Sequence, residues 1–138
     1  MEKDSVRTFV SALQLAFLGR DWVSFATFFK LPLVVYSAAG VFVLRTKSQL
    51  LTVGGDYRDT MGTMDVTSAQ VEIENIEPMS NGRFRATVRV KDFTEDGKEV
   101  TGSLVRYFLV QTDGSYQVEM LEYLETAIPL SDMKRILH

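Results

Sequence analysis

Residues 71–92 read VEIENIEPMSNGRFRATVRVKD, and this stretch decides the fold. Apolar and polar residues alternate on both sides of Asn81-Gly82, a dipeptide that tolerates positive φ and is a strong signal for a β-hairpin. A two-residue turn there places acidic residues opposite basic ones: Glu74 faces Arg89, and Glu72 faces Lys91. Because such cross-strand pairs stabilise a sheet, they favour this register. One face of the hairpin is therefore expected to be ionic and the other apolar.

Three polar residues fall among the apolar ones on the second face of this hairpin, namely Asn75, Glu77 and Asp92. The apolar face must pack against the rest of the chain, so we expect these side chains to point inward. Two carboxylates on one inner face could divide the roles of acid and base. A bulge, or a position at a strand end, would instead leave each of them solvated.

Two more turns, at Asp96-Gly97 and Asp113-Gly114, divide the chain after Thr67 into four antiparallel strands. The inward face of the third strand depends on the first of these turns. We prefer a three-residue loop with Gly97 in the left-handed conformation. In that register the residues that point inward are Gly102, Leu104, Arg106, Phe108 and Val110. A two-residue loop points inward Ser103, Val105, Tyr107 and Leu109. In the preferred register the residues of the last strand that point inward are Tyr116, Val118, Met120 and Glu122.

Helical patterns and one hairpin occupy the chain before the meander. Apolar residues between 6 and 17 recur at three- and four-residue steps, which predicts a helix ending at Gly19. Asp21 can cap a second helix, which must end before Pro32. A hairpin over 33–37 and 41–44 is expected next, and then a third helix over 48–61. Gly54-Gly55 inside that helix indicates a kink or close backbone packing.

Composition excludes several classes of function. The 138 residues fit a single domain, 1–138, and 46% of them are hydrophobic. With no cysteine and one histidine, His138, the chain offers no disulfide, thiolate chemistry or histidine-cluster metal site, and we expect no metal and no cofactor. A net charge of −3 without a basic block argues against nucleic acid or an anionic membrane as a partner. The first residues lack the pattern of a signal peptide, which predicts a cytoplasmic protein.

The predicted order of elements resembles the nuclear transport factor 2-like superfamily, which has a cystatin-like α+β fold. Local sequences resemble it too: Gly19-Arg20-Asp21-Trp22 leads into an aromatic helix, Leu31-Pro32-Leu33 opens the first strand, and DGSYQV (113–118) resembles the closing Asp-Gly-Arg-Trp-x-Ile. The resemblance covers nearly the whole chain. It implies the order α-α-β-β-α-β-β-β-β, a cone in which a strongly bent antiparallel sheet wraps three N-terminal helices around a pocket, often with dimerisation through the sheet's outer face.

Enzymes of this superfamily include ketosteroid isomerases, limonene epoxide hydrolases and SnoaL-like polyketide cyclases. A ketosteroid isomerase combines a carboxylate base with a tyrosine and a protonated aspartic acid. Here the first predicted helix has no tyrosine, and the first hairpin turn, VVYSAAG (34–40), has no carboxylate. Among the polar residues that the preferred register points inward, the candidate catalytic residues are Glu122, Asp92 and Arg106. Arg106 would orient an anionic ligand while Glu122 moves a proton, or the two would form a structural ion pair.

Two further sets of residues complete the expected site. The pocket is expected to be lined by Trp22, Phe25, Tyr36, Asn75, Val88, Leu104, Phe108, Tyr116 and Met120. An apolar patch on the outer face is expected to join two copies as a homodimer, through Val105, Tyr107, Leu121 and Tyr123. The sequence favours a small domain that binds a hydrophobic or anionic metabolite. The alternatives are a proton-transfer enzyme of the isomerase, cyclase or hydrolase kind, and a protein-interaction module.

Overall fold

The computed structural model describes residues 2–126, which form three helices and six strands. In chain order these are α1 (Glu2–Leu18), α2 (Trp22–Thr27), β1 (Phe29–Ser37), β2 (Gly40–Leu44), α3 (Lys47–Gly62), β3 (Ser68–Pro78), β4 (Arg83–Phe93), β5 (Glu99–Thr112) and β6 (Ser115–Thr126). This is the predicted order of elements, so the α+β fold class is confirmed. Ser131 can also cap a short helix, which the sequence predicts over 132–137, and this segment lies outside the described residues.

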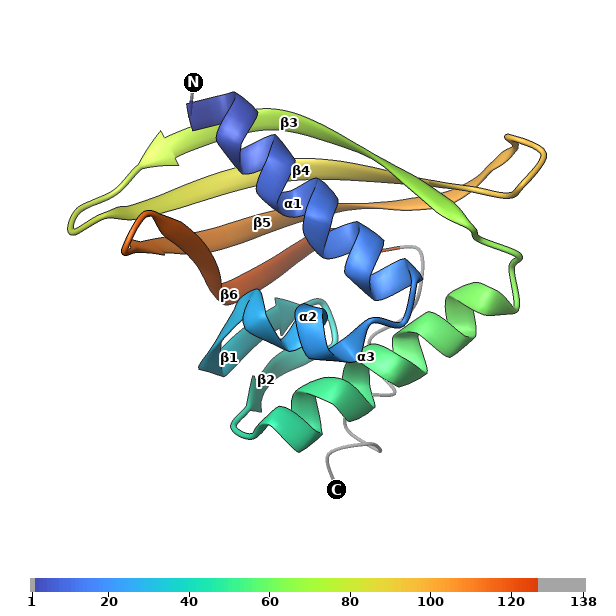
Figure 1. Ribbon diagram of the computed structural model, residues 1–138, viewed down its shortest axis with the longest axis horizontal. Helices are drawn as coiled ribbons and strands as arrows, with labels where there is room; N and C mark the ends of the chain where they lie inside the picture. The colour runs from blue at the N-terminus through green and yellow to red at the C-terminus, as the bar shows by residue number, and fades with distance from the viewer. Residues whose placement is uncertain (1, 127–138) are drawn as a thin grey trace.

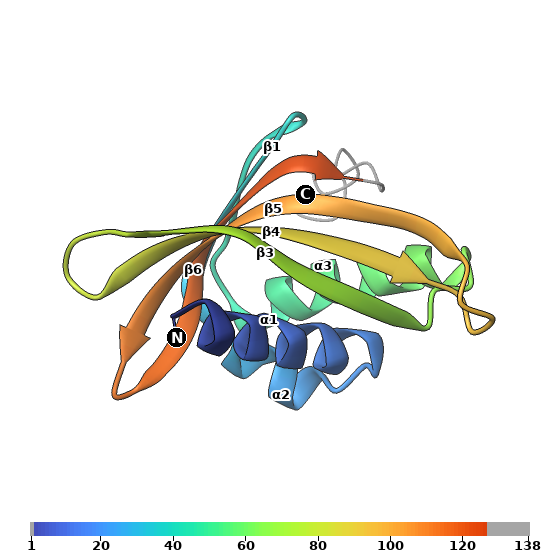
Figure 2. The same ribbon diagram turned by 90° about the horizontal axis from the view of Figure 1, so that it is seen from above.

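One sheet contains every strand, in the order β2-β1-β6-β5-β4-β3. All neighbours are antiparallel except β1 and β6, which run parallel and join the first hairpin to the last strand. Figure 1 shows the three helices lying in front of this sheet. Seen from above, in Figure 2, the strands bend around one side and all three helices lie against that concave side.

Local signals position the helices as the sequence predicts. The Asp21 side chain caps α2 by accepting a hydrogen bond from the Ser24 amide at 3.2 Å. Thr46 and Gln49 form a reciprocal capping box at the start of α3. Arg58 then ties α3 to its neighbours, because its guanidinium donates to the Leu18 carbonyl at 3.0 Å and to the Val66 carbonyl at 3.4 Å.

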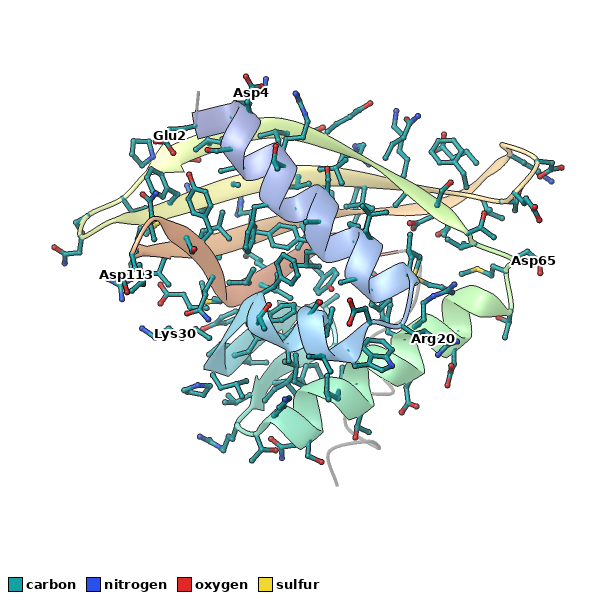
Figure 3. All side chains as sticks on the ribbon, viewed as in Figure 1. Glu2, Asp4, Arg20, Lys30, Asp65 and Asp113 are labelled. Atoms are coloured by element: carbon teal, nitrogen blue, oxygen red, sulfur yellow. The ribbon has the colours of Figure 1, made fainter. Side chains whose placement is uncertain are left out.

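The core lies between the helices and the concave side of the sheet. Its fully buried residues come from α1, β1 and the meander alike, and include Val6, Val10, Leu33, Val88, Leu109 and Val118. Charged side chains other than the buried Asp92 lie mostly at the periphery, as Figure 3 shows for Glu2, Asp4, Lys30, Asp65 and Asp113. Removal of this apolar surface from water drives the packing of the helices onto the sheet.

The convex face of the sheet is ionic, as expected. Cross-strand ion pairs join Arg83 to Glu119 (2.8 Å), Arg85 to Glu77 (2.5 Å), Arg89 to Glu74 (3.5 Å), Lys91 to Glu72 (3.2 Å) and Arg106 to Glu122 (3.0 Å). The predicted two-residue turn is wrong, because the Met79 amide bonds to the Arg83 carbonyl across a three-residue loop. Together with a bulge at Glu74, this loop places Arg89 opposite Glu72, and the two predicted ion pairs form diagonally.

The expectation that Asn75 and Glu77 point inward is wrong. The β3–β4 register shifts between Ile73 and Asn75, so that Glu74 is the extra residue of a β-bulge. Beyond the bulge the alternation of side chains is reversed, and Ile76 takes the inward position opposite Ala86. Asn75 is exposed and donates to Glu77 on the convex face.

The preferred inward face of the third meander strand, β5, is also wrong, although the predicted turn forms. Thr94 and Lys98 close a three-residue loop, and Gly97 has the left-handed φ of 85°. A bulge follows at once, because Asp92 pairs with Thr101 but Phe93 pairs with Glu99, which leaves Val100 as the extra residue. One added residue exchanges the two faces of the strand. The concave face therefore carries Ser103, Val105, Tyr107 and Leu109, the alternative set.

Gly102 lies two residues beyond this bulge and allows β5 to approach β4 closely. A Cβ atom added at Gly102 would lie 2.7 Å from the Val90 carbonyl oxygen, which is a backbone atom and has little room to move. We expect Gly102→Ala to lower the free energy of unfolding by about 1–3 kcal/mol, as over-packing commonly does. Chemical denaturation measures this change.

Gly55→Ala is the matched control, since nothing lies within 4 Å of a Cβ added on that side of α3. Alanine favours a helix over glycine, so this variant should gain up to about 1 kcal/mol. Equal stability of Gly102→Ala and the unchanged protein would show that the close approach at Gly102 is not a constraint.

Candidate functional site

A cavity of about 100 Å³ lies between the concave side of the sheet and the helices. Its wall is mostly apolar and is contributed by all three helices and by strands β1, β2, β4, β5 and β6. The aromatic part of the wall consists of Phe17, Phe25, Phe29, Tyr57, Tyr107 and Tyr123. Aliphatic side chains such as Leu33, Val53 and Val105 form most of the rest. Such a wall suits the apolar part of a small molecule.

Close packing of α3 on α2 shapes one side of this cavity. A Cβ atom added at Gly54 would lie 3.1 Å from the Phe25 ring, so the helices approach each other where α3 has no side chain. The prediction of close backbone packing at this glycine pair is therefore confirmed for Gly54. Phe25 contacts Phe29 with ring centroids 4.9 Å apart, which fixes the aromatic wall beneath the sheet.

Asp92 is the one acidic residue in the cavity wall formed by residues 2–126. It lies near the end of β4 with a side chain that is nearly fully buried, the residue being 5% exposed. Among the described residues, its Oδ1 atom has no hydrogen-bond partner. Burial raises the pKa of this carboxyl from 3.8 to about 6, because the charged form loses hydration that no neighbour replaces.

Three tyrosines line the same cavity from three different elements: Tyr57 of α3, Tyr107 of β5 and Tyr123 of β6. Burial raises the pKa of each phenol above its usual value of 10, and the charge of Asp92 adds to the effect at Tyr57 and Tyr107. All three are therefore neutral near pH 7. The Tyr107 hydroxyl accepts a hydrogen bond from Gln14 at 3.4 Å, and Tyr57 interacts with the Thr126 side chain.

This arrangement places one desolvated carboxyl and several phenol hydroxyls at the polar part of an apolar cavity. A phenol hydroxyl can donate or accept a hydrogen bond, whereas an ionised carboxylate can only accept. The site can therefore orient one polar group of a ligand, and Asp92 can take up or release a proton at a pH close to neutral.

Of the three predicted catalytic residues, the structure brings Asp92 to the cavity. Glu122 and Arg106 form the expected ion pair at 3.0 Å, but on the convex face, with side chains 36% and 35% exposed. Their predicted inward position is wrong, because the bulge at Val100 turns Arg106 outward and its partner on β6 follows it.

Phe25 lies in the cavity wall as predicted, and the other expected lining residues lie elsewhere. Leu104, Phe108 and Met120 alternate with cavity residues and so occupy the convex face. Val88 is buried in the core, Asn75 and Tyr36 are exposed, and Trp22 packs behind Phe25 with ring centroids 5.3 Å apart. Tyr116 lies beside α1, where its hydroxyl is 3.0 Å from Ser5 and donates to Glu2.

The expected position of the dimer patch is wrong for the same reason, namely the bulge that exchanges the two faces of β5. Val105, Tyr107, Leu121 and Tyr123 all line the internal cavity, so they do not form an outer surface. The bulge at Val100 reverses β5, and the β5–β6 register shifts between Phe108 and Leu109 and between Leu104 and Val105. Sequence reasoning thus named two of the cavity tyrosines but assigned them to the opposite face.

Tyr57 and Gln14 were missed altogether as site residues. Tyr57 belongs to a polar run, Asp56 to Asp59, and such a run is typical of a solvated helix face. The signal that identifies it is its position three residues after Gly54, on the side of α3 that packs against α2. Gln14 follows the buried Leu13 of α1, and nothing in its local sequence sets it apart.

No group of three or more histidine, cysteine, aspartate or glutamate side chains between residues 2 and 126 is arranged to hold a metal ion. Within the same range, no helix has both the length and the apolar character needed to cross a membrane.

The sequence profile of a family described as "NTF2-like protein (DUF6841)" matches residues 3–125. The chain therefore belongs to this NTF2-like family, and the resemblance stated from the sequence is confirmed. No curated protein matches the sequence.

Solved structures with the same fold include proteins from two groups of bacteria. Aln2 from a Streptomyces species is 18% identical, with a TM-score of 0.64 over 87% of each chain. ActVI-ORFA from Streptomyces coelicolor is 16% identical, with a TM-score of 0.67 over 90% of this chain and 94% of its own. A domain of unknown function with a cystatin-like fold from Nostoc punctiforme is 15% identical, with a TM-score of 0.68 over 96% of this chain and 82% of its own. At these identities the similarity shows the fold.

The raised pKa of Asp92 predicts how stability depends on pH. A carboxyl whose pKa is 3.8 unfolded and about 6 folded holds its proton more tightly in the folded protein, so stability falls as pH rises from about 4 to about 6. Asp92→Asn removes this dependence. Relative to the unchanged protein, the variant should gain stability over that range, by at most about 3 kcal/mol. Urea denaturation at pH 4, 5, 6 and 7.5 measures the difference.

Asp96→Asn is a control of opposite sign. Asp96 is exposed, and a hydrogen bond from Thr94 lowers the pKa of its carboxyl. That variant should be less stable than the unchanged protein by a nearly constant amount across this series, because a lowered pKa makes stability change with pH below about 3.8, outside the series. If the free energies of unfolding of Asp92→Asn and the unchanged protein differed by the same amount at every pH, the desolvation of Asp92 would be contradicted.

Proposed function

We propose that this domain binds a small, mostly apolar ligand in the cavity between the sheet and the helices, with one polar group of the ligand directed to Asp92. The observation that carries the proposal is the buried Asp92 carboxyl, whose Oδ1 has no partner among residues 2–126, in an otherwise apolar cavity. A buried polar atom without a partner is costly, and ligand binding is a common reason for keeping one.

The volume limits the size of the ligand. An apolar cavity of about 150 Å³ accepts benzene, and this cavity is about 100 Å³. The ligand portion that enters it therefore has the size of a five-membered ring or a short branched chain. The wall contains no lysine, arginine or histidine among the described residues, so nothing there compensates an anionic group. This feature supports an uncharged or cationic ligand over the anionic one included in the sequence-based expectation.

Binding of five-membered-ring compounds tests the proposal. Cyclopentanol, cyclopentanone and cyclopentylamine have matched shapes and differ in their polar group. At about 100 times its dissociation constant, a bound compound stabilises the folded protein by about 2.7 kcal/mol. We expect at least one of the three to raise the thermal unfolding temperature in a dose-dependent way.

A variant that fills the cavity separates this effect from binding elsewhere. Val53 lines the cavity and is 7% exposed, so Val53→Phe should abolish the shift. Val23→Phe makes the same change at a position that is 78% exposed, and should leave the shift intact. If no compound stabilises the protein, or if Val53→Phe leaves the shift unchanged, the proposal fails.

A proton-transfer enzyme is the second candidate, because the pKa of Asp92 is about 6 and neutral phenols line the same cavity. In such a reaction the Asp92 carboxylate removes a proton from the carbon next to a carbonyl, and a phenol hydroxyl donates to the resulting enolate oxygen. The proton then returns from Asp92 to the carbon.

In deuterated water the proton held by Asp92 exchanges for a deuteron before it returns to the carbon, so loss of the α-proton NMR signals of cyclopentanone reports this step. Asp92→Asn should slow the protein-dependent exchange by about a hundredfold. Glu122→Gln should leave it unchanged, since Glu122 lies on the convex face. Equal exchange rates in the unchanged protein and in Asp92→Asn would remove Asp92 from the chemistry.

A further inference from the structure

The side chains around Asp92 restrict the chemical class of the ligand's polar group. The other polar side chains that line this cavity are all neutral: the phenols of Tyr57, Tyr107 and Tyr123, the amide of Gln14 and the hydroxyl of Ser103. Within residues 2–126, no salt bridge involves Asp92, and its Oδ1 accepts no hydrogen bond. The cavity therefore presents an acidic oxygen that the described protein leaves uncompensated.

We propose that the ligand carries a cationic amine, whose ammonium group binds the Asp92 carboxylate inside the cavity. This inference rests on the proposed function and specifies the class of ligand. An ammonium group supplies three N–H donors and the positive charge that the described wall of the cavity lacks. A carbonyl compound supplies an acceptor alone, and would pair with Asp92 only after the carboxyl had taken up a proton.

The hydroxyls in this cavity also suit a group that donates hydrogen bonds. A phenol oxygen accepts as well as donates, as the Tyr107 hydroxyl does when it accepts from Gln14 at 3.4 Å. Ammonium N–H groups that do not reach Asp92 can therefore be shared with tyrosine oxygens. Each hydrogen bond of this kind involves a charged donor and is stronger than a neutral one.

The aromatic wall provides a second attraction for a cation. The faces of aromatic rings carry partial negative charge and attract ammonium groups within about 6 Å of the ring centre. Phenylalanine and tyrosine rings from α1, α2, α3, β1, β5 and β6 line this cavity together with Asp92. An ammonium group on an apolar five-carbon ring would thus meet a carboxylate and aromatic rings together, while the ring occupies the aliphatic part of the wall.

The matched compounds of the preceding section test this inference by isothermal titration calorimetry at pH 7.5. We expect cyclopentylamine to bind at least about tenfold more tightly than cyclopentanol or cyclopentanone, because pairing with a buried charge outweighs a neutral hydrogen bond. Cyclopentanecarboxylate should not bind. Asp92→Asn should weaken cyclopentylamine at least about tenfold and change cyclopentanol by less than about threefold.

Glu122→Gln is the control, since this carboxylate is paired with Arg106 on the convex face, outside the cavity, and its change should leave the preference for the amine intact. If cyclopentanol or cyclopentanone binds as tightly as the amine, the inference is wrong while the proposed pocket stands. The same conclusion follows if amine binding survives Asp92→Asn. If none of the compounds binds, the inference and the proposed function are both wrong.

Discussion

The close contact between β4 and β5 at Gly102 is the constraint on which the rest of the structure depends. A Cβ atom at this position would lie 2.7 Å from the Val90 carbonyl oxygen, and the bulge at Val100 adds one residue shortly before it. Together they determine which face of β5 meets the helices. With the observed register, Tyr107 faces the interior, and Arg106 is held outside with Glu122. A shift by one residue would bury an arginine and expose a tyrosine.

The two faces of the sheet consequently use charge in different ways. On the convex face, arginine and glutamate side chains neutralise one another in partly exposed pairs, and each such pair contributes little to stability. On the concave face, Asp92 is buried among phenols and aliphatic groups with no countercharge among the described residues. Burial without a countercharge destabilises the ionised form, and this is the usual physical mark of a position kept for a ligand or a reaction.

Prediction from sequence succeeded where the signal is local. The N-cap at Asp21, the close packing at Gly54 and the left-handed turn at Gly97 all follow from single residues or short spacings. The inward face of β5 could not be obtained in this way. Val100 looks like an ordinary strand residue, and whether it forms a bulge depends on contacts with β4 that its neighbours in sequence do not reveal.

The same limit explains what was missed in the candidate site. Asp92 precedes the bulge and was placed inward correctly, because only the alternation of its own strand was needed. Tyr107 and Tyr123 follow the bulge and were placed outward. Tyr57 reaches the cavity because of how α3 packs. Its polar neighbours Asp56 and Asp59 instead indicate that this part of the helix faces solvent. The carboxyl of the site could therefore be found from the sequence, whereas the tyrosines around it required the tertiary structure.

The parallel pairing of β1 with β6 has a consequence for biosynthesis. β6 is the last strand of the described chain, and it separates the early hairpin, β1 and β2, from the rest of the sheet. During translation, that hairpin is made long before the strand that connects it to the meander. One edge of the hairpin therefore has no partner strand until β6 has been synthesised. Closing the sheet requires contacts between distant parts of the chain, and such a topology is typical of slow folding. Within the described residues β6 completes the sheet, and its Leu121 and Tyr123 also complete the wall of the cavity.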